Sequence, residues 1–188
     1  GEMIPKHLDI IAKYNKNVKL DVDEWGIWTD QEPGTIQGHL YQQNTLRDAL
    51  LASTTCDIFH QYAYGLGMCN IAQMINVLQA MILTKGDKMI LTPTYHVFKM
   101  YAVHQNAKYI PLNFFSPKYT YNGESINALS ATLSKKNGVY HLSITNVDPK
   151  KENSITLDLA ALNATTVAKA EILTSKSFSD FNSFDNPN

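Results

Sequence analysis

The chain has 188 residues, of which 44% are hydrophobic, and its formal net charge at pH 7 is −1. This composition predicts a folded globular protein and excludes both a disordered chain and a nucleic-acid-binding protein that depends on a basic surface. No apolar run approaches the roughly 20 residues that cross a bilayer, so we expect no membrane-spanning segment. Cys56 and Cys69 form no disulfide framework or zinc motif, and His60, His96 and His104 lack metal-ligand spacing, so we expect no metal and no cofactor.

The first half of the chain alternates between helical and extended patterns. Residues 7–14 have apolar side chains at helical spacing, and residues 19–25 follow as a short apolar strand. Glycine and proline mark a loop over residues 29–38. Residues 40–60 give the strongest helical pattern of the chain. A later proline places the start of another helix near residue 95, and the pattern continues to about residue 105.

Residues 68–79, which lie between these helices, support two interpretations. Amide side chains recur at every third position of an otherwise apolar segment: Asn70, Gln73, Asn76 and Gln79. A polar stripe on one face of a helix has this spacing. A strand tip and loop that present amides to a hydroxylated ligand would also produce it. The pattern leaves both interpretations open.

The second half of the chain, from about residue 106, is predicted to be all β. Short apolar or alternating segments are separated by polar turns, over residues 108–115, 126–133, 139–147, 155–159 and 167–173. Short strands at such spacing predict a β-sandwich. The predicted fold class is therefore α/β plus all-β, with an α/β domain at residues 1–105 and a β-sandwich domain at residues 106–188.

An acidic cluster at the end of the first predicted strand is the most informative local feature. Strict alternation would place Leu20, Val22 and Glu24 on one face of the strand, with Trp25 and Trp28 close by. Strand interiors disfavour carboxylates, because an unpaired buried charge is costly. Glycosidases built on (β/α)8 barrels place carboxylates at such strand ends, beside aromatic rings. The alternative is that the acidic residues only open a loop or cap the next helix.

Four segments resemble a known family in their residues, order and rough spacing. They are DEWGIW at 23–28, LYQQNTLRDAL at 40–50, NIAQMINVLQA at 70–80 and LTPTYHVF at 91–98. These segments closely resemble the α-L-arabinofuranosidases of glycoside hydrolase family 51, and the segment at 40–50 is the most specific. The resemblance covers nearly the whole chain. It implies the C-terminal part of a (β/α)8 barrel followed by a jelly-roll-like β-sandwich.

The resemblance also implies roles for individual residues. Glu24 matches the nucleophile of a retaining glycosidase, which forms a covalent glycosyl-enzyme. Gln73 matches a glutamine that binds the sugar, and Trp28 lies where an aromatic wall of the pocket is expected. For Trp28 the alternative is a core tryptophan. Asp23 should point away from Glu24, because a neighbouring acid would raise the pKa of a nucleophile that must stay ionised.

One essential group of the family pattern is missing from these residues. A retaining site needs a second carboxyl about 5–5.5 Å from the nucleophile. The family supplies it from an Asn-Glu pair, and this sequence contains no Asn-Glu dipeptide. The family's first six barrel strands and its last sandwich strands are also unmatched. We therefore expect a fragment truncated at both ends, and we expect the 188 residues alone to be inactive.

Two other function classes remain open at this point. One is a non-catalytic carbohydrate-binding or structural β-sandwich module, and the other is a retaining glycosidase of the same barrel type with another sugar specificity. The resemblance implies an arabinose-containing oligosaccharide or polysaccharide as the partner, hydrolysed at terminal α-L-arabinofuranosyl residues. It also implies a homo-oligomer for the full-length protein. The location, cytoplasmic or exported from a bacterium, is left open.

Overall fold

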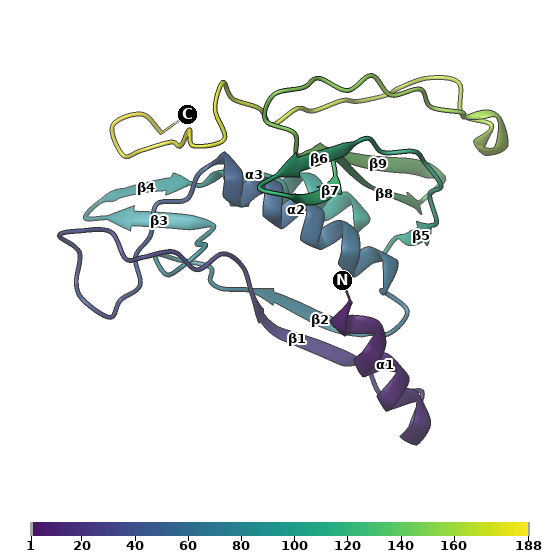
Figure 1. Ribbon diagram of the computed structural model, residues 1–188, viewed down its shortest axis with the longest axis horizontal. Helices are drawn as coiled ribbons and strands as arrows, with labels where there is room; N and C mark the ends of the chain where they lie inside the picture. The colour runs from purple at the N-terminus through teal and green to yellow at the C-terminus, as the bar shows by residue number, and fades with distance from the viewer. Residues whose placement is uncertain (1, 188) are drawn as a thin grey trace.

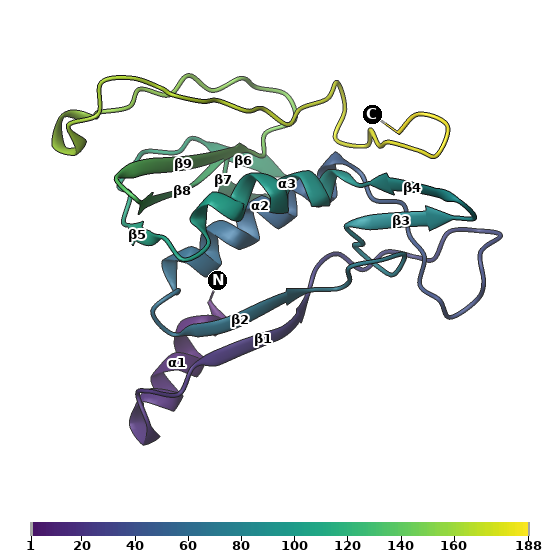
Figure 2. The same cartoon turned by 180° about the vertical axis from the view of Figure 1, so that it is seen from behind.

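A computed structural model describes residues 2–187, so the predicted domain bounds at Gly1 and Asn188 lie outside the described residues. The chain starts with helix α1 (Met3–Tyr14), strand β1 (Leu20–Trp25), helix α2 (Leu46–Gln61) and strand β2 (Leu66–Ile71). Strands β1 and β2 pair in parallel, and α2 connects them. Figures 1 and 2 show α2 running alongside the strand pair, as in the βα repeat of an α/β protein.

The start of α2 is later than the sequence pattern predicted, at residue 46 instead of residue 40. Leu40 has a positive φ of 53°, which ends any helical run at that position. The buried carboxylate of Asp48 then accepts hydrogen bonds from the backbone N–H of Thr45, at 2.7 Å, and from its hydroxyl, at 3.2 Å. This capping contact, rather than the apolar periodicity, fixes the first residue of the helix.

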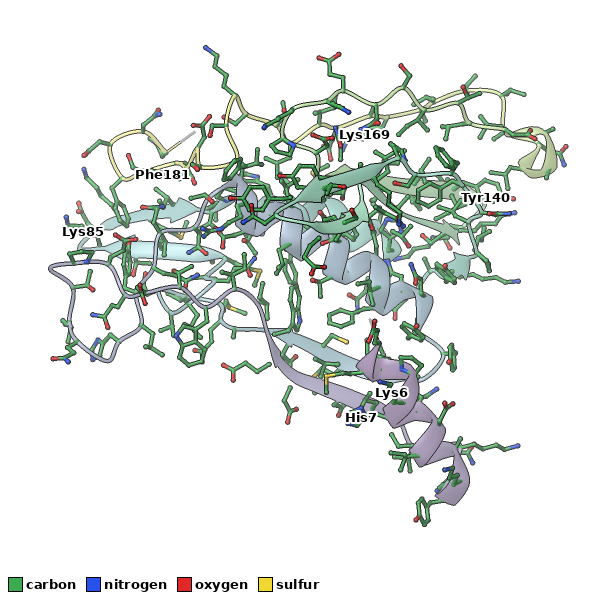
Figure 3. The ribbon with its side chains drawn as sticks, in the orientation of Figure 1. Lys6, His7, Lys85, Tyr140, Lys169 and Phe181 are labelled. Carbon is green, nitrogen blue, oxygen red and sulfur yellow. The ribbon has the colours of Figure 1, made fainter. Side chains whose placement is uncertain are left out.

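The first turn of α2 is completed by a segment from the far end of the chain. The backbone N–H of Leu46 donates to the carbonyl of Asp180 (2.9 Å), and that of Arg47 donates to Phe178 (2.8 Å). Free N–H groups at a helix start need such acceptors. Figure 3 shows Phe181 of the same segment beside strand β4 (Lys88–Leu91). Residues 178–181 therefore tie the end of the described chain to α2.

The middle of the chain forms a hairpin and a third, shorter helix. Strand β3 (Ile82–Lys85) pairs with β4, and helix α3 (Pro93–Tyr101) follows with Pro93 in its first turn. The last predicted turn of this helix is instead the 3₁₀ helix η1 (Ala102–His104). Helix α3 packs against α2, where Val97 meets Ala49 and Ala52 in a small core.

The second half contains an antiparallel sheet of three strands in the order β5-β8-β9. These strands are β5 (Lys108–Ile110), β8 (Leu129–Lys136) and β9 (Val139–Asn146). A separate hairpin joins β6 (Lys118–Tyr121) to β7 (Glu124–Asn127). On β9, Tyr140 lies at the rim of the sheet, where its hydroxyl accepts a hydrogen bond from Lys135 at 3.0 Å (Figure 3). The sequence predicted the three strands of the sheet, although β5 is shorter than expected and the predicted strand at 126–133 is divided between β7 and β8; β6 was not predicted.

The strands predicted at residues 155–159 and 167–173 are wrong. Among the described residues after Asn146, only the 3₁₀ helix η2 (Ala160–Leu162) is regular. Figures 1 and 2 show the rest as extended traces that run above the sheet. Val167 and Ile172 are 75% and 85% exposed, so the apolar side chains of this segment are not buried. No strand pairs with the segment in the described residues. Alternation favours extended backbone, but a strand also needs backbone hydrogen bonds to a neighbour.

The helices meet the sheet through a seam of buried polar side chains. The carboxylate of Asp57 on α2 is fully buried and accepts hydrogen bonds from Tyr101 of α3 (2.8 Å) and Ser130 of β8 (2.6 Å). His60 of α2 lies within hydrogen-bond distance of Thr132 on β8, at 3.1 Å. Such a seam specifies how two layers fit together, because each buried polar group needs its own partner.

Candidate functional site

The carboxyl end of β1 departs from strict strand alternation. Val22 pairs with Cys69, but Trp25 pairs with Ile71, so β1 has one extra residue in this interval. This bulge lets Trp25 follow Leu20 and Val22 as a half-buried residue, while Glu24 is exposed. The prediction that Glu24 shares the face of Leu20 and Val22 is therefore wrong. Bulges redirect single side chains in this way and occur often beside functional sites.

Trp25 anchors the end of the strand in the protein interior. Its ring contacts Phe59 of α2 edge-on, with centroids 5.4 Å apart, and stacks on Phe98 of α3 at 6.0 Å. It also packs against the core formed by α2 and α3. Large aromatic contacts of this kind immobilise the backbone that supports them. The residue directly before Trp25, Glu24, is thus presented from a fixed position.

Glu24 and Trp28 line the same hollow, which has a volume of about 180 Å³. The rest of the lining comes from the turn after β1 and from the segment after β2, namely Trp25, Gly26, Ile27, Ala72 and Leu78. Trp28 is 67% exposed, so the described residues do not bury it in their own core. The hollow thus brings a carboxylate and an exposed indole together beside the carboxyl ends of two parallel strands.

Gln73 lies at the edge of this arrangement. It is exposed and directly follows Ala72, which lines the hollow, but Gln73 itself is not part of the lining. The backbone N–H of Ala72 donates to the carbonyl of Trp25 at 2.8 Å, which joins the two strand ends. The peptide bond between Ala72 and Gln73 is cis. Asp23 is exposed and is also absent from the lining of the hollow.

The row of amides at residues 70–79 belongs to a strand and a loop, so the helical interpretation is wrong. Asn70 is in β2, and the other three follow it in the loop. Two of the four amides are used by the fold itself. Asn76 exchanges two hydrogen bonds of 2.7 Å with Thr84, and Gln79 is fully buried. Only Asn70 and Gln73 are exposed and free to face a ligand.

Sequence reasoning missed the residues that hold the turn carrying Trp28. Gln42 and Gln79 are both buried, and their side-chain amides bind the backbone of Ile27 and Thr29 on either side of Trp28. Gln79 was expected either on a helix stripe or at a ligand. Gln42 belongs to the segment at 40–50 that resembles the family, and the sequence predicted no separate role for it. The sequence signal for these glutamines is a polar residue inside an apolar segment. That signal does not identify the backbone groups to which the side chain is hydrogen-bonded.

Two buried ionisable groups, Asp57 and His104, lie at the seam and do not line the hollow. Burial raises the pKa of Asp57 to about 6, although its two hydroxyl donors act in the opposite direction. Burial lowers the pKa of His104 to about 4, and the nearby His60 and His141 add to this effect. Among residues 2–187, no group of three or more His, Cys, Asp or Glu side chains could hold a metal ion. In the same residues, no helix is long and apolar enough to cross a membrane.

Comparisons with known proteins identify the family. The family described as "Alpha-L-arabinofuranosidase C-terminal domain" matches residues 23–188. An intracellular exo-α-L-arabinofuranosidase from Bacteroides ovatus is 51% identical over 191 residues, which cover all of this chain and 37% of that protein. The chain therefore spans little more than a third of the length of this curated relative.

Solved structures show the same relationship. A family 51 arabinofuranosidase from Xanthomonas axonopodis pv. citri is 40% identical with a TM-score of 0.82, and the match covers 99% of this chain and 38% of that one. A family 51 enzyme from Bifidobacterium longum has a TM-score of 0.80 at 20% identity, over 99% of this chain and 41% of that one, and so supports the fold alone. Together with the family match, these similarities show that the chain belongs to the α-L-arabinofuranosidases of glycoside hydrolase family 51 and corresponds to their C-terminal portion.

Proposed function

We propose that the protein containing this chain is a retaining α-L-arabinofuranosidase that removes terminal α-L-arabinofuranosyl residues from arabinan or arabinoxylan. One observation supports this most directly. Glu24 and Trp28 share a hollow at the carboxyl ends of two parallel strands, in a chain 51% identical to an exo-α-L-arabinofuranosidase. Active sites of (β/α)8 enzymes lie at this end of their strands. Residues 1–105 would then form the last part of the barrel and residues 106–188 a β-sandwich domain.

Glu24 is the proposed nucleophile. Its carboxylate attacks the anomeric carbon, forms a carbon–oxygen bond and displaces the leaving-group oxygen, which takes a proton from a second carboxylic acid. Water then attacks the same carbon, gives its proton to that second carboxylate and releases arabinose and free Glu24. We propose that the second carboxyl comes from outside these 188 residues. On this reasoning, the 188 residues alone do not hydrolyse arabinofuranosides.

Trp28 and Gln73 are the proposed sugar-binding residues. The exposed indole of Trp28 offers an apolar face to the C–H side of a furanose ring, while the carboxylate of Glu24 lies in the same hollow. Gln73 is exposed one residue beyond the hollow, and its amide can bind sugar hydroxyls as both donor and acceptor. Asp23 is not part of the lining, which agrees with a nucleophile that has no acidic neighbour in the pocket.

The decisive experiment uses the full-length protein and 4-nitrophenyl α-L-arabinofuranoside. Glu24→Ala should lower kcat by at least about 10³-fold, as loss of a covalent nucleophile does. Added azide should restore turnover and yield the β-configured arabinofuranosyl azide, because azide occupies the space of the missing carboxylate. Asp23→Asn is the matched control and should keep most of the activity. Full activity in Glu24→Ala, or rescue without the β-azide, would contradict the assignment.

The same assay separates the other function classes. A retaining glycosidase of different specificity would prefer another aryl glycoside, such as the xylopyranoside, to the arabinofuranoside. A carbohydrate-binding module would hydrolyse neither one. Turnover by the 188 residues alone would contradict the proposal that the second carboxyl lies elsewhere. Size-exclusion chromatography with light scattering of the full-length protein tests the further proposal that it forms a homo-oligomer.

A further inference from the structure

Two buried glutamines hold the turn that presents Trp28; we call Gln42 and Gln79 the glutamine bracket. The Oε1 atom of Gln79 accepts a hydrogen bond from the backbone N–H of Ile27 at 2.8 Å. The amide of Gln42 donates to the carbonyl of Ile27 at 3.1 Å and accepts from the N–H of Thr29 at 3.0 Å. The bracket therefore fixes the backbone on both sides of Trp28.

Both side chains are placed for this task from elements far apart in the sequence. Gln42 is 1% exposed and precedes α2, while Gln79 is fully buried in the loop before β3. Gln79 also donates to the carbonyl of Asp48 at 2.7 Å and lies 3.1 Å from the hydroxyl of Thr94. It thus links the turn to the first turns of α2 and α3. Buried side-chain amides in folded proteins are almost always hydrogen-bonded, and the bonds of Gln42 and Gln79 meet this requirement.

The neighbouring glycine shows how closely the bracket approaches the turn. Gly26 has a φ of +142°, a backbone conformation that side chains disfavour. A Cβ atom added there would lie 3.2 Å from Oε1 of Gln79 and 3.4 Å from its Cβ. The chain therefore leaves β1 through a residue without a side chain, directly against the bracket. Glu24 lies two residues before Gly26, on the strand end that leads into this constrained turn.

We propose that Gln42 and Gln79 are positioning residues that set the Trp28 wall of the sugar pocket. This inference rests on the proposed function. Trp28 is 67% exposed, so the described residues cover little of its ring, and the three bracket bonds to Ile27 and Thr29 set the backbone that carries the indole. A loosened bracket should weaken sugar binding more than it slows the attack by Glu24, because Trp25 anchors the strand end independently.

The test compares Gln42→Met with Gln43→Met in the full-length protein. Both side-chain bonds of Gln42 go to the turn, and methionine keeps its approximate shape without its hydrogen bonds. The control residue Gln43 is next in sequence, and its side chain donates to Asn44 instead of the turn. For 4-nitrophenyl α-L-arabinofuranoside, Gln42→Met should raise KM about tenfold, the effect of about one net hydrogen bond, and change kcat less than about threefold. Gln43→Met should leave both near the parent values.

A double-mutant cycle with Trp28→Ala tests the route of the effect. If Gln42 acts through Trp28, Gln42→Met should change KM less than about twofold once the indole is gone. An unchanged KM in Gln42→Met, or the same tenfold increase with and without Trp28, would overturn the inference. If Gln42→Met does not fold, Gln42→Asn keeps an amide that is too short to reach both partners, and the same criteria apply to it.

A readout without catalysis separates this inference from the proposed function. In protein labelled with 5-fluorotryptophan, the ¹⁹F resonance lost in Trp28→Ala identifies Trp28. That resonance should shift or broaden in Gln42→Met and not in Gln43→Met. Absence of any arabinofuranosidase activity in the parent protein would refute the proposed function. An unperturbed Trp28 resonance in Gln42→Met would refute the bracket, whether or not the protein is active.

Discussion

Replacement of Asp57 by asparagine should change how stability depends on pH. The carboxyl is fully buried, and this burial raises its pKa in the folded state from the usual 3.8 to about 6. A raised folded-state pKa means that the folded protein holds the proton more tightly than the unfolded chain. The stability from this proton is fully present below pH 3.8 and is lost as the pH rises through 6.

The difference between a pKa of 3.8 and one of about 6 corresponds to about 3 kcal/mol, because a tenfold change in proton affinity is worth about 1.4 kcal/mol. Asparagine can still bind the hydroxyls of Tyr101 and Ser130 but has no charge to lose. The free energy of unfolding of the parent, minus that of Asp57→Asn, should therefore fall by most of this amount, about 2 kcal/mol, between pH 4 and pH 7. This difference removes the titration of the histidines, which is common to both proteins.

The assay is urea unfolding of both proteins across this pH range, followed by tryptophan fluorescence, because Trp25 packs in the core that α2 forms. Asp87→Asn, in the exposed turn between β3 and β4, is the control and should give a flat difference. A flat difference for Asp57→Asn as well would refute the reasoning, because it would mean that the buried carboxyl binds its proton no more tightly in the folded state.

Three further predictions concern other sites. Burial lowers the pKa of His104 to about 4, so the folded protein favours the neutral ring. The stability that comes from this preference is present above pH 6.5 and is lost as the pH falls towards 4. His104→Gln should therefore reduce acid unfolding in a pH titration followed by circular dichroism. Gly26→Ala should lower the free energy of unfolding by about 1–3 kcal/mol, measured in urea, since φ there is +142° and Gln79 is in the way. Deletion of residues 178–188 should lower the thermal midpoint in calorimetry, because the N–H groups of Leu46 and Arg47 lose their acceptors.

The sequence predicted the elements that are determined by local rules. The period of apolar residues located α1, β1 and α2, and Pro93 marked the start of α3 within two residues. The alternation of residues 139–147 predicted β9 almost to its ends. These patterns depend on neighbouring residues alone, so one sequence is enough to detect them.

Features that depend on distant partners were not predictable in this way. Residues 167–173 alternate as a strand would, but no neighbouring strand pairs with them in the described structure. The bulge in β1 arises from pairing with β2, more than 40 residues later, and it reversed the expected face of Glu24. At the candidate site, the strand pattern singled out Glu24 and Trp28, and the family resemblance implied their roles. The glutamine bracket was not found, because its bonds join Gln79 to Ile27 across 52 residues.

The hydrogen bonds from Leu46 and Arg47 to residues 178–180 have a consequence for the order of assembly. A ribosome makes the acceptors about 130 residues after the donors, so the nascent chain carries α2 without these two partners over that interval. The first turn of α2, in the βαβ unit that carries Glu24, therefore gains two of its hydrogen-bond acceptors last. Until residues 178–180 are made, the N–H groups of Leu46 and Arg47 depend on water for acceptors.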